Sequence, residues 1–394
     1  MGIESTTLLG ATKCIAIIGG GVAGVTTAYF LGKIGYKVNL YDYNGIAEQC
    51  SYANGGQLSV CNAETWNTYD NILKGIKWLT QPDAPLAFRP DLWSWSKVKW
   101  VAGFLGATIT NTYDRNTRKT IEYSLRSREL MCELIDEIDI NFHQQDCGIL
   151  HIYKNQKSWD KARKTLDKFK NSDWGRIEET SDLTEKYNIV SDDVVGATIT
   201  KQDGVGDIHE FCLQLHEYMT KNFDYKLIKQ KIIKEDLIKL KKSYDEVIVC
   251  AGAYTPQFLP QLNIYPIKGY SITYDLVENA PTVSILDDDK KIVASTFANN
   301  VFRVAGTAEL AGWDHKLRQD RINPLVKWVE ENTFVNKDSY EKWACLRPMT
   351  PNMLPIVDKI DGIWVNSGAG HLGWTMCLAL AEKLTNKVIN KVRT

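Results

Sequence analysis

Short apolar runs and segments with helical spacing alternate from the start of the 394-residue chain. Residues 14–18 (CIAII) form an uninterrupted apolar run that ends at three glycines, which is typical of a buried strand. Helical spacing follows over 22–32, and 36–41 (YKVNLY) predicts a second strand. A strand, a helix and a strand within about 30 residues match a parallel crossover unit, so we expect a parallel sheet to begin here.

The middle of the chain predicts helices and isolated strands. Residues 116–140 have helical apolar spacing, and 148–153 (GILHIY) predicts a strand that precedes a charged helix at 159–169. Asp207, followed by Glu210 three residues later, resembles a capping box. We therefore expect a helix from this point to about residue 221.

The remaining pattern divides the chain into two interleaved parts. Residues 271–310 alternate in short pieces, which predicts antiparallel strands. A strand at 247–250, a strand at 363–366 and a helix at 374–388 return to the nucleotide-binding pattern. We expect a mixed α/β fold with two discontinuous domains. The predicted ranges are 13–90, 198–263 and 344–394 for the nucleotide-binding domain, and 91–197 and 264–343 for an antiparallel substrate domain.

Composition excludes several classes of protein. The 47 basic and 48 acidic residues nearly cancel, which argues against a nucleic-acid partner, and 44% hydrophobic residues argue against disorder. The nine cysteines show neither a CxxC pair nor zinc-ligand spacing, so we expect a reduced compartment and no metal site. The uncharged stretch 14–31 is rich in glycine and is not expected to span a membrane.

The first glycine cluster carries the strongest chemical signal. Gly19, Gly21 and Gly24 form GxGxxG between the first strand and helix, and Asp42 ends the next strand. Such glycines permit a tight turn, close approach of a pyrophosphate and close helix packing, while the acid binds a ribose diol. The motif predicts an adenine dinucleotide. The alternative is that the glycines only pack a strand against a helix.

Three further features are candidates for ligand contact. A second GxGxxG at 368–373 has too few residues after it for another ribose-binding strand, but the start of its helix suits negative charge. The small residues of 51–59 (SYANGGQLS) suit backbone contacts to a flat ring. Arg347, stiffened by nearby prolines, can bind a carboxylate through two parallel hydrogen bonds. Taken alone, a surface salt bridge is the competing interpretation for Arg347.

Together these motifs resemble the FAD-dependent amino-acid oxidase superfamily, and within it the bacterial D-amino acid dehydrogenases, over nearly the whole chain. Besides the first glycine motif, the resemblance rests on 53–59 (ANGGQLS), 76–86 (IKWLTQPDAPL), 268–273 (KGYSIT), 284–287 (SILD), 346–351 (LRPMTP) and 372–376 (LGWTM).

The resemblance implies a Rossmann-type FAD-binding domain and assigns roles to particular residues. Arg347 matches the arginine that clamps the substrate carboxylate, and Tyr270 is a further candidate for the substrate pocket. The residues implied to contact FAD are Gly19, Gly21, Val22, Ala23, Gly24, Asp42, Tyr43, Ser51, Asn54, Gly55, Gly56, Gln57, Gly370, Leu372, Gly373, Trp374 and Thr375.

The implied reaction is oxidative deamination of an amino acid by hydride transfer to flavin, with the D enantiomer as the expected substrate. The imino acid hydrolyses to a keto acid and ammonia, and a quinone is the expected electron acceptor. One alternative is an oxidase or dehydrogenase of glycine, sarcosine, proline or an opine. Another is an inactive FAD-binding subunit, because Ala369 replaces the histidine of the family's Gly-His-Gly and the chain stops at Thr394, short of the family's final segment.

Two stretches raise the question of membrane contact. Trp93, Trp100 and Phe104 lie at helical spacing beside Lys97, and 221–242 is rich in lysine. Core packing and an ordinary solvated surface are the competing interpretations. The expected location is cytoplasmic, with peripheral contact to the inner membrane left open, and the sequence predicts no oligomeric state.

Overall fold

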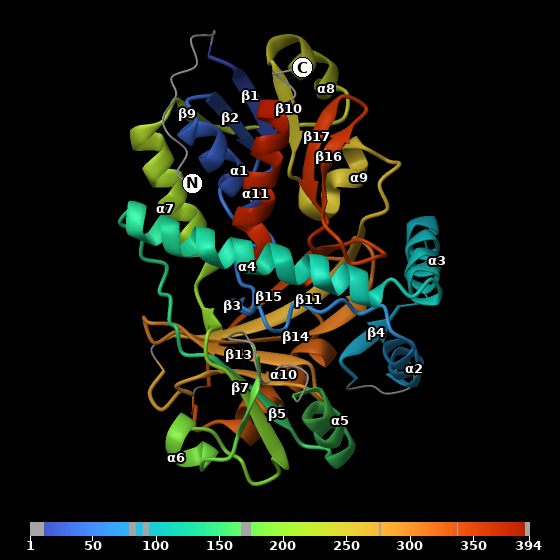
Figure 1. Cartoon of the computed structure of the whole chain (residues 1–394), viewed down its shortest axis with the longest axis vertical. Coiled ribbons are helices and arrows are strands. Elements are labelled where there is room, and N and C mark those ends of the chain that lie inside the picture. Colours follow the sequence, from blue (N-terminus) through green and yellow to red (C-terminus); the bar gives the residue numbers. More distant parts are fainter. Residues whose placement is uncertain are drawn as a thin grey trace.

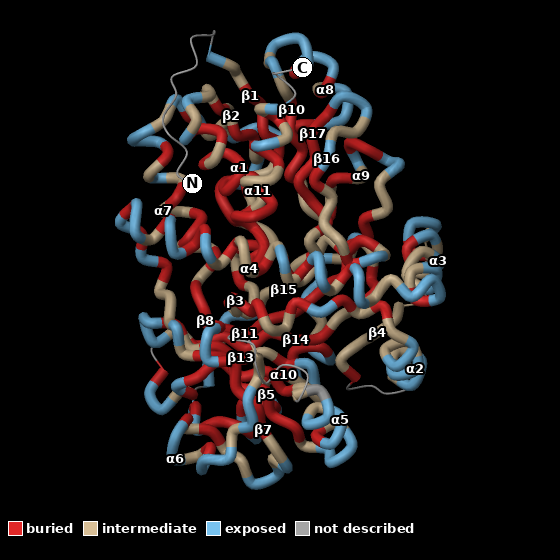
Figure 2. Tube along the Cα trace, viewed as in Figure 1, coloured by how far each residue is buried: buried red, intermediate tan, exposed pale blue. Residues whose placement is uncertain are grey.

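Each half of the molecule is built on one β-sheet, and the long helix α4 (Tyr113–Glu137) runs across the middle between them (Figure 1). The computed structural model describes residues 12–78, 84–89, 94–166, 175–275, 277–336 and 338–390. Figure 2 shows that burial is concentrated in the two sheets and in α11 (Gly373–Asn390), whereas the small peripheral helices are exposed.

The first sheet has six strands in the described residues, in the order β16-β17-β10-β1-β2-β9. All neighbours pair in parallel except β16, an antiparallel edge strand. Helices α1, α7 and α11 share one core with this sheet, and α8 and α9 pack on another. The bounds are β1 (Cys14–Ile18), α1 (Val22–Lys33), β2 (Lys37–Asp42), α7 (Ile208–Asn222), β9 (Tyr225–Lys229), α8 (Asp236–Ser243), β10 (Glu246–Val249), α9 (Thr255–Phe258), β16 (Ile356–Ile360) and β17 (Ile363–Ser367).

The second sheet runs in the order β15-β11-β14-β13-β12-β5-β7-β6, and β4 pairs with β14. It is largely antiparallel, although β12 pairs with β5 and β14 with β4 in parallel. Helix α10 (Gln319–Asn332) buries its apolar side on one face. The bounds are β4 (Leu86–Phe88), β5 (Ile149–Tyr153), β6 (Ile177–Glu179), β7 (Gly196–Thr200), β11 (Tyr265–Tyr274), β12 (Ser284–Asp287), β13 (Ile292–Thr296), β14 (Phe302–Leu310) and β15 (Glu341–Met349).

Short elements complete the fold around and between the sheets. Strands β3 and β8 form a two-stranded ribbon, and helices α2, α3, α5 and α6 lie at the periphery (Figure 1). Their bounds are β3 (Gln57–Leu58), α2 (Tyr69–Trp78), α3 (Trp95–Ile109), α5 (Gln156–Leu166), α6 (Leu183–Tyr187), β8 (Gly204–Val205) and the two 3-10 turns η1 (Gly252–Tyr254) and η2 (Gly370–Leu372).

Most predicted elements are present within a few residues of their expected ends. The capping box is confirmed, because the Asp207 carboxylate accepts hydrogen bonds from the backbone N–H groups of His209 (2.8 Å) and Glu210 (3.2 Å). The predicted antiparallel pieces of 271–310 are the strands that pair within β11–β14. The last residues of the helix predicted at 159–169, like the boundary near residue 90, lie outside the described residues.

Three segments lie on the other side of the predicted domain boundaries. Strands β4 and β15 belong to the second sheet, although 13–90 and 344–394 were assigned to the nucleotide-binding domain. Helix α4 packs against α11 in the core of the first sheet. The first half of its buried side consists of polar residues, so apolar periodicity does not reveal that face: Asn116, Thr120, Ser124 and Ser127.

The structure supports core packing for two of the residues considered for an interfacial helix. In α3 the Trp100 side chain is buried and its Nε1 donates to the Met349 carbonyl at 2.8 Å, and the buried Lys97 Nζ donates to the Arg89 carbonyl at 2.8 Å. These two residues therefore pack in the interior, while Trp93 lies outside the described residues. No helix in the described part of the chain is both long and apolar enough to cross a membrane.

Candidate active site

A cavity of about 1200 Å³ is lined by residues from both sheets. This volume exceeds the usual range for a single small ligand, about 300–1000 Å³, and is suited to a cofactor together with a substrate. All the residues predicted to contact FAD or substrate line it except Gly24. The structure therefore brings together segments that lie up to about 350 residues apart in the sequence, from Gly19 to Thr375.

The three glycines of the first motif serve different purposes. Gly19 has φ of +112°, and a Cβ there would lie 2.5 Å from the Cys250 carbonyl oxygen. A Cβ on Gly24 would lie 1.8 Å from the Gly19 oxygen, so Gly24 lets α1 pack closely on β1. A Cβ on Gly21 would meet only Ser51 Oγ, at 3.5 Å, because it would stand in the cavity. The protein leaves open the space that a pyrophosphate needs beside Gly21.

Asp42 is held at the edge of this open space. Its carboxylate accepts hydrogen bonds from the backbone N–H groups of Gly20 (2.8 Å) and Asn44 (2.9 Å) through different oxygens. Oδ1 also accepts from the Gly45 N–H at 3.3 Å, whereas Oδ2 keeps a further acceptor site for a ribose hydroxyl. Ser51 Oγ accepts from the Val22 N–H at 3.0 Å and so caps one amide at the start of α1. These residues fit the ADP half of FAD.

The loop before β3 has carbonyl groups that are satisfied by the protein. The Ala53 carbonyl accepts from Ser271 Oγ (2.7 Å), and the Gly55 carbonyl accepts from Ser295 Oγ (2.7 Å). The Gly56 carbonyl accepts from Trp374 Nε1 at 3.2 Å. This pattern fixes the loop on the second sheet beside the start of α11. Ser271 and Ser295 were not predicted, because only the sheet brings them under this loop.

The second glycine motif forms the opposite wall of the cavity. Gly370 has φ of +61°, and the turn η2 leads directly into α11 at Gly373. Thr375 Oγ1 accepts from the Ser59 N–H at 3.3 Å, which joins this wall to the loop after β3. The positive end of α11 therefore faces a cavity that can hold a ring with developing negative charge.

Arg347 lies across the second sheet on the cavity side. It starts from β15, passes over Gly269 of β11 and donates from Nη1 to the Thr307 carbonyl of β14 at 3.2 Å. Among the described residues no carboxylate lies within the 4.0 Å of an ion pair. A guanidinium in this position is available for an anionic ligand, so the surface salt bridge considered for Arg347 is not formed.

Gly269 is required for this position of Arg347. A Cβ at Gly269 would lie 2.0 Å from Arg347 Nη1 and 2.2 Å from Cζ, a distance that forces the guanidinium to move. We expect Gly269→Ala to lower kcat/KM for carboxylate substrates by about 10-fold or more while FAD content stays unchanged, since a displaced charged bond is worth about 1.5–3 kcal/mol. Steady-state kinetics and flavin absorbance check this. A Gly269→Ala variant with full activity would show that substrate binding does not require the Arg347 guanidinium to lie over residue 269.

Several buried polar atoms of the cavity wall have no protein partner among the described residues. They are Ser59 Oγ, Thr307 Oγ1, Trp343 Nε1 and His371 Nδ1. Buried polar groups are nearly always hydrogen-bonded in native proteins, so such atoms at a cavity indicate groups that a ligand satisfies. Ser59 lies in the predicted 51–59 loop, whereas the other three were not predicted as site residues.

His371 is a neutral imidazole close to Arg347. Its ring stacks on Trp66, with ring centroids 4.4 Å apart and planes at 21°. Burial, reinforced by the positive charge of Arg347, lowers the pKa of His371 to about 3. His371 stands beside the position where the family histidine is replaced by Ala369, and it lines the cavity itself.

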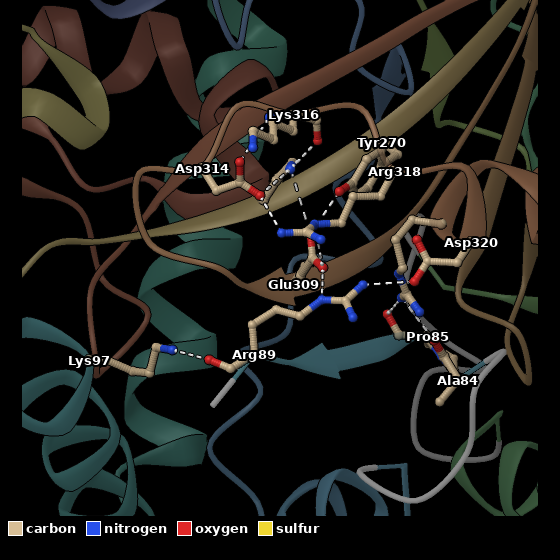
Figure 3. Close-up of polar contacts among 12 residues, drawn as sticks. Ala84, Pro85, Arg89, Lys97, Tyr270, Glu309, Asp314, Lys316, Arg318 and Asp320 are labelled. Atoms are coloured by element: carbon tan, nitrogen blue, oxygen red, sulfur yellow. Dashed lines mark hydrogen bonds and ion pairs between the residues drawn. The ribbon is translucent and has the colours of Figure 1, made fainter. Parts of the chain in front are cut away.

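Tyr270 also lines the cavity, but its hydroxyl belongs to a buried polar cluster (Figure 3). The hydroxyl donates to Glu309 Oε2 at 2.7 Å, and Glu309 Oε1 accepts from Arg89 Nε at 2.5 Å. Glu309 is fully buried, with Lys268 Nζ at 3.7 Å. The cluster joins β11, β14 and the segment after β4. Because its hydroxyl is bound to Glu309, the catalytic role of Tyr270 stays a prediction.

Comparison with known proteins agrees with the geometry. The family model described as FAD dependent oxidoreductase matches residues 14–387. The chain is 37% identical to D-amino acid dehydrogenase 3 of Mesorhizobium japonicum, covering 95% of this chain and 96% of the relative. It is 31% identical to D-amino acid dehydrogenase of Granulibacter bethesdensis, covering 96% of both chains.

The fold is similar to that of solved flavoenzymes. Glycine oxidase from Geobacillus kaustophilus superposes with a TM-score of 0.72 over 95% of each chain, at 14% sequence identity. This similarity confirms the predicted mixed α/β architecture. The match of the family model over nearly the whole chain, on a cavity whose glycines and Asp42 leave room for a dinucleotide, shows that the chain belongs to the FAD-dependent oxidoreductases.

Proposed function

We propose that the chain oxidises free amino acids, chiefly D-amino acids, to keto acids and ammonia. The observation that supports this most is Arg347, an arginine without a described carboxylate partner in the same cavity as the glycine motif. Preference for the D enantiomer is supported by the curated relatives, which are named D-amino acid dehydrogenases.

The residues of the cavity suit this reaction. Arg347 binds the substrate carboxylate through two parallel hydrogen bonds, and its contact with the Thr307 carbonyl fixes the guanidinium in place. The neutral His371 offers Nδ1 as an acceptor for an N–H of the substrate amine. When bound, FAD supplies the acceptor for the hydride from the substrate Cα. The imino acid product then hydrolyses in water.

Anaerobic mixing of the purified holoenzyme with amino acids tests this function. We expect D-alanine to bleach the visible absorption of the flavin, L-alanine to leave it unchanged, and the product to be the keto acid. Glycine, sarcosine and L-proline belong in the same panel, because they represent the alternative substrates. Bleaching only by one of these three would replace the proposed substrate class, and no bleaching by any amine would support an inactive FAD-binding protein.

We further propose that electrons leave to a membrane quinone and that the protein contacts the membrane peripherally through α2 and α3. The two helices line the cavity, with Ile72 and Phe104 among the lining residues. The same helices also expose apolar side chains, including Leu73 (66% exposed) and Trp95 (82% exposed). Such a surface can rest in the headgroup region and deliver an apolar acceptor to the cavity. The lysine-rich stretch around α8 lies at the top of the view in Figure 1, away from α2 and α3 at the right edge.

Vesicle flotation and flavin reoxidation test this second proposal. We expect the protein to float with vesicles containing anionic lipid, and Leu73→Ser with Trp95→Ser to abolish flotation. Ile238→Ser, which alters an equally exposed apolar residue of α8, is the matched control and should float. A soluble quinone should reoxidise the reduced flavin much faster than oxygen. Equal rates together with no flotation would favour an oxidase.

A further inference from the structure

Besides Arg347, the lining of the same cavity includes four cations, and we call the part of the cavity that they line the cationic arm. Two carboxylates, Glu64 and Asp288, line this arm in the described part of the chain. The cations that line it are Lys74 from α2, Lys161 from α5, Arg176 just before β6, and Lys291 between β12 and β13. The arm therefore has an excess of positive charge on its walls.

The arm begins next to the position of Arg347. The Arg347 guanidinium donates to the Thr307 carbonyl on β14. Strands β13 and β14 pair antiparallel with Val293 opposite Ala305, and continuing this register by two residues places Lys291 beside Thr307. Adjacent strands are about 5 Å apart. A substrate held by its carboxylate at Arg347 can thus direct its side chain over one strand into the cationic arm.

Arg176 has no ion-pair partner among the described residues. Its Nη2 donates to two neutral acceptors, the Cys61 carbonyl at 3.0 Å and Asn62 Oδ1 at 3.1 Å. No carboxylate in the described ranges approaches its guanidinium within 4.0 Å. Burial acts to lower the pKa of Arg176, but nearby groups that include Asp288 and Glu64 raise it, so the charge persists in the cavity wall. The remaining N–H groups of Arg176 can therefore bind an anion in the cavity.

Two of the other three cations are already paired. Lys291 Nζ lies 2.9 Å from Asp288 Oδ1, and Asp288 also bonds the buried His151. Lys161 pairs with Asp70 at 2.5 Å, at the surface between α5 and α2. These pairs reduce the positive charge that remains for a ligand. The strongest remaining donors to a ligand are Arg176 and Lys74 of α2.

Lys74 is the second cation without an ion pair among the residues the structure describes. Partial burial and the nearby ammonium groups of Lys291 and Lys161 lower its pKa. The carboxylates of Asp289 and Asp70 oppose this effect, and the three lysines all line the cavity. An anion placed between these groups would relieve their mutual repulsion.

We propose that Arg176 and Lys74 form a second anion site, which binds the distal carboxylate of the substrate, so that acidic amino acids are the preferred substrates. The inference rests on the proposed function, because it concerns the side chain of the substrate that Arg347 holds. Arg176 takes the carboxylate with its remaining N–H groups, and Lys74 closes the site from α2.

Paired substrates of equal shape test this site in the holoenzyme. We expect kcat/KM for D-glutamate to exceed that for D-glutamine by about 10-fold or more, mainly through KM. Arg176→Met should lower the glutamate-to-glutamine ratio by about 10- to 100-fold, and Lys74→Met should lower it less. Lys164→Met removes an exposed lysine of α5 outside the cavity and should leave the ratio unchanged.

A binding measurement separates this inference from the proposed function. Glutarate and butyrate are titrated against the holoenzyme, and the change in flavin absorbance gives their affinities. We expect glutarate to bind about 10-fold more tightly than butyrate, and Arg176→Met or Lys74→Met to remove the difference. Oxidation of neutral D-amino acids with a glutamate-to-glutamine ratio at or below one, together with equal binding of the two acids, would overturn the anion site and leave the function intact. Tighter binding of glutarate without oxidation of any amino acid would support the anion site and contradict the proposed function.

Discussion

Gly21→Val is expected to give a folded protein that no longer retains FAD. Gly21 has φ of −74° and ψ of 178°, which any residue adopts, and a Cβ there meets only Ser51 Oγ at 3.5 Å. The added side chain therefore costs little in the empty protein, but it fills the space where the pyrophosphate approaches the start of α1. We expect FAD affinity to fall by about 100-fold, or ~2.7 kcal/mol.

Fluorescence titration of the apoprotein with FAD measures this loss, and thermal unfolding of the apoprotein shows whether the fold is retained. Gly21→Ala should lie between the native protein and Gly21→Val. Gly24→Ala is the contrasting variant, because its Cβ would lie 1.8 Å from the Gly19 oxygen and should lower the unfolding temperature of the apoprotein itself. Full FAD occupancy in Gly21→Val would place the pyrophosphate elsewhere.

The sequence predicts those parts of the fold and site whose determinants are local. The run 14–18, the glycines after it and Asp42 lie within one crossover unit, and the structure confirms this unit. Asp207 caps α7 through amides two and three residues away. In these cases the residues that decide the conformation are neighbours in the chain, so spacing is sufficient to predict it.

The rest depends on contacts between distant segments. His371 lies between Trp66 and Arg347 only because the loop before α2, the turn η2 and β15 meet at one wall. Gly269 leaves space for the Arg347 guanidinium only because the register of β11 with β15 brings Arg347 over it. The spacing of these residues in the sequence does not predict that they are neighbours in the fold.

Arg347 is the clearest case in which the sequence alone and the folded structure support different interpretations. On spacing alone a surface salt bridge was the stronger interpretation, and the resemblance to the family reversed it. The structure adds an independent physical reason, since no carboxylate of the described residues pairs with the guanidinium and a glycine makes room for it. The resemblance and the geometry therefore support the same assignment on separate grounds.

Arg347→Lys is expected to lower kcat/KM for amino acids by about 10- to 150-fold and to leave FAD content unchanged. A lysine provides a point charge and cannot form the two parallel hydrogen bonds of a guanidinium, and a hydrogen bond to a charged group is worth about 1.5–3 kcal/mol. Arg347→Met, which removes the charge as well, should have the larger effect. Steady-state kinetics with D-alanine measures both variants.

Two comparisons make this result specific to the substrate carboxylate. Arg118→Lys changes an exposed arginine of α4 outside the cavity and should have native kinetics. Binding of butyrate, followed by flavin absorbance, should weaken in Arg347→Lys by the same factor as kcat/KM, because both ligands depend on the same contact. If the lysine variant binds butyrate and turns over D-alanine as the native protein does, the substrate carboxylate is held elsewhere in the cavity. The cations Arg176 and Lys74 would then be the first candidates to bind it.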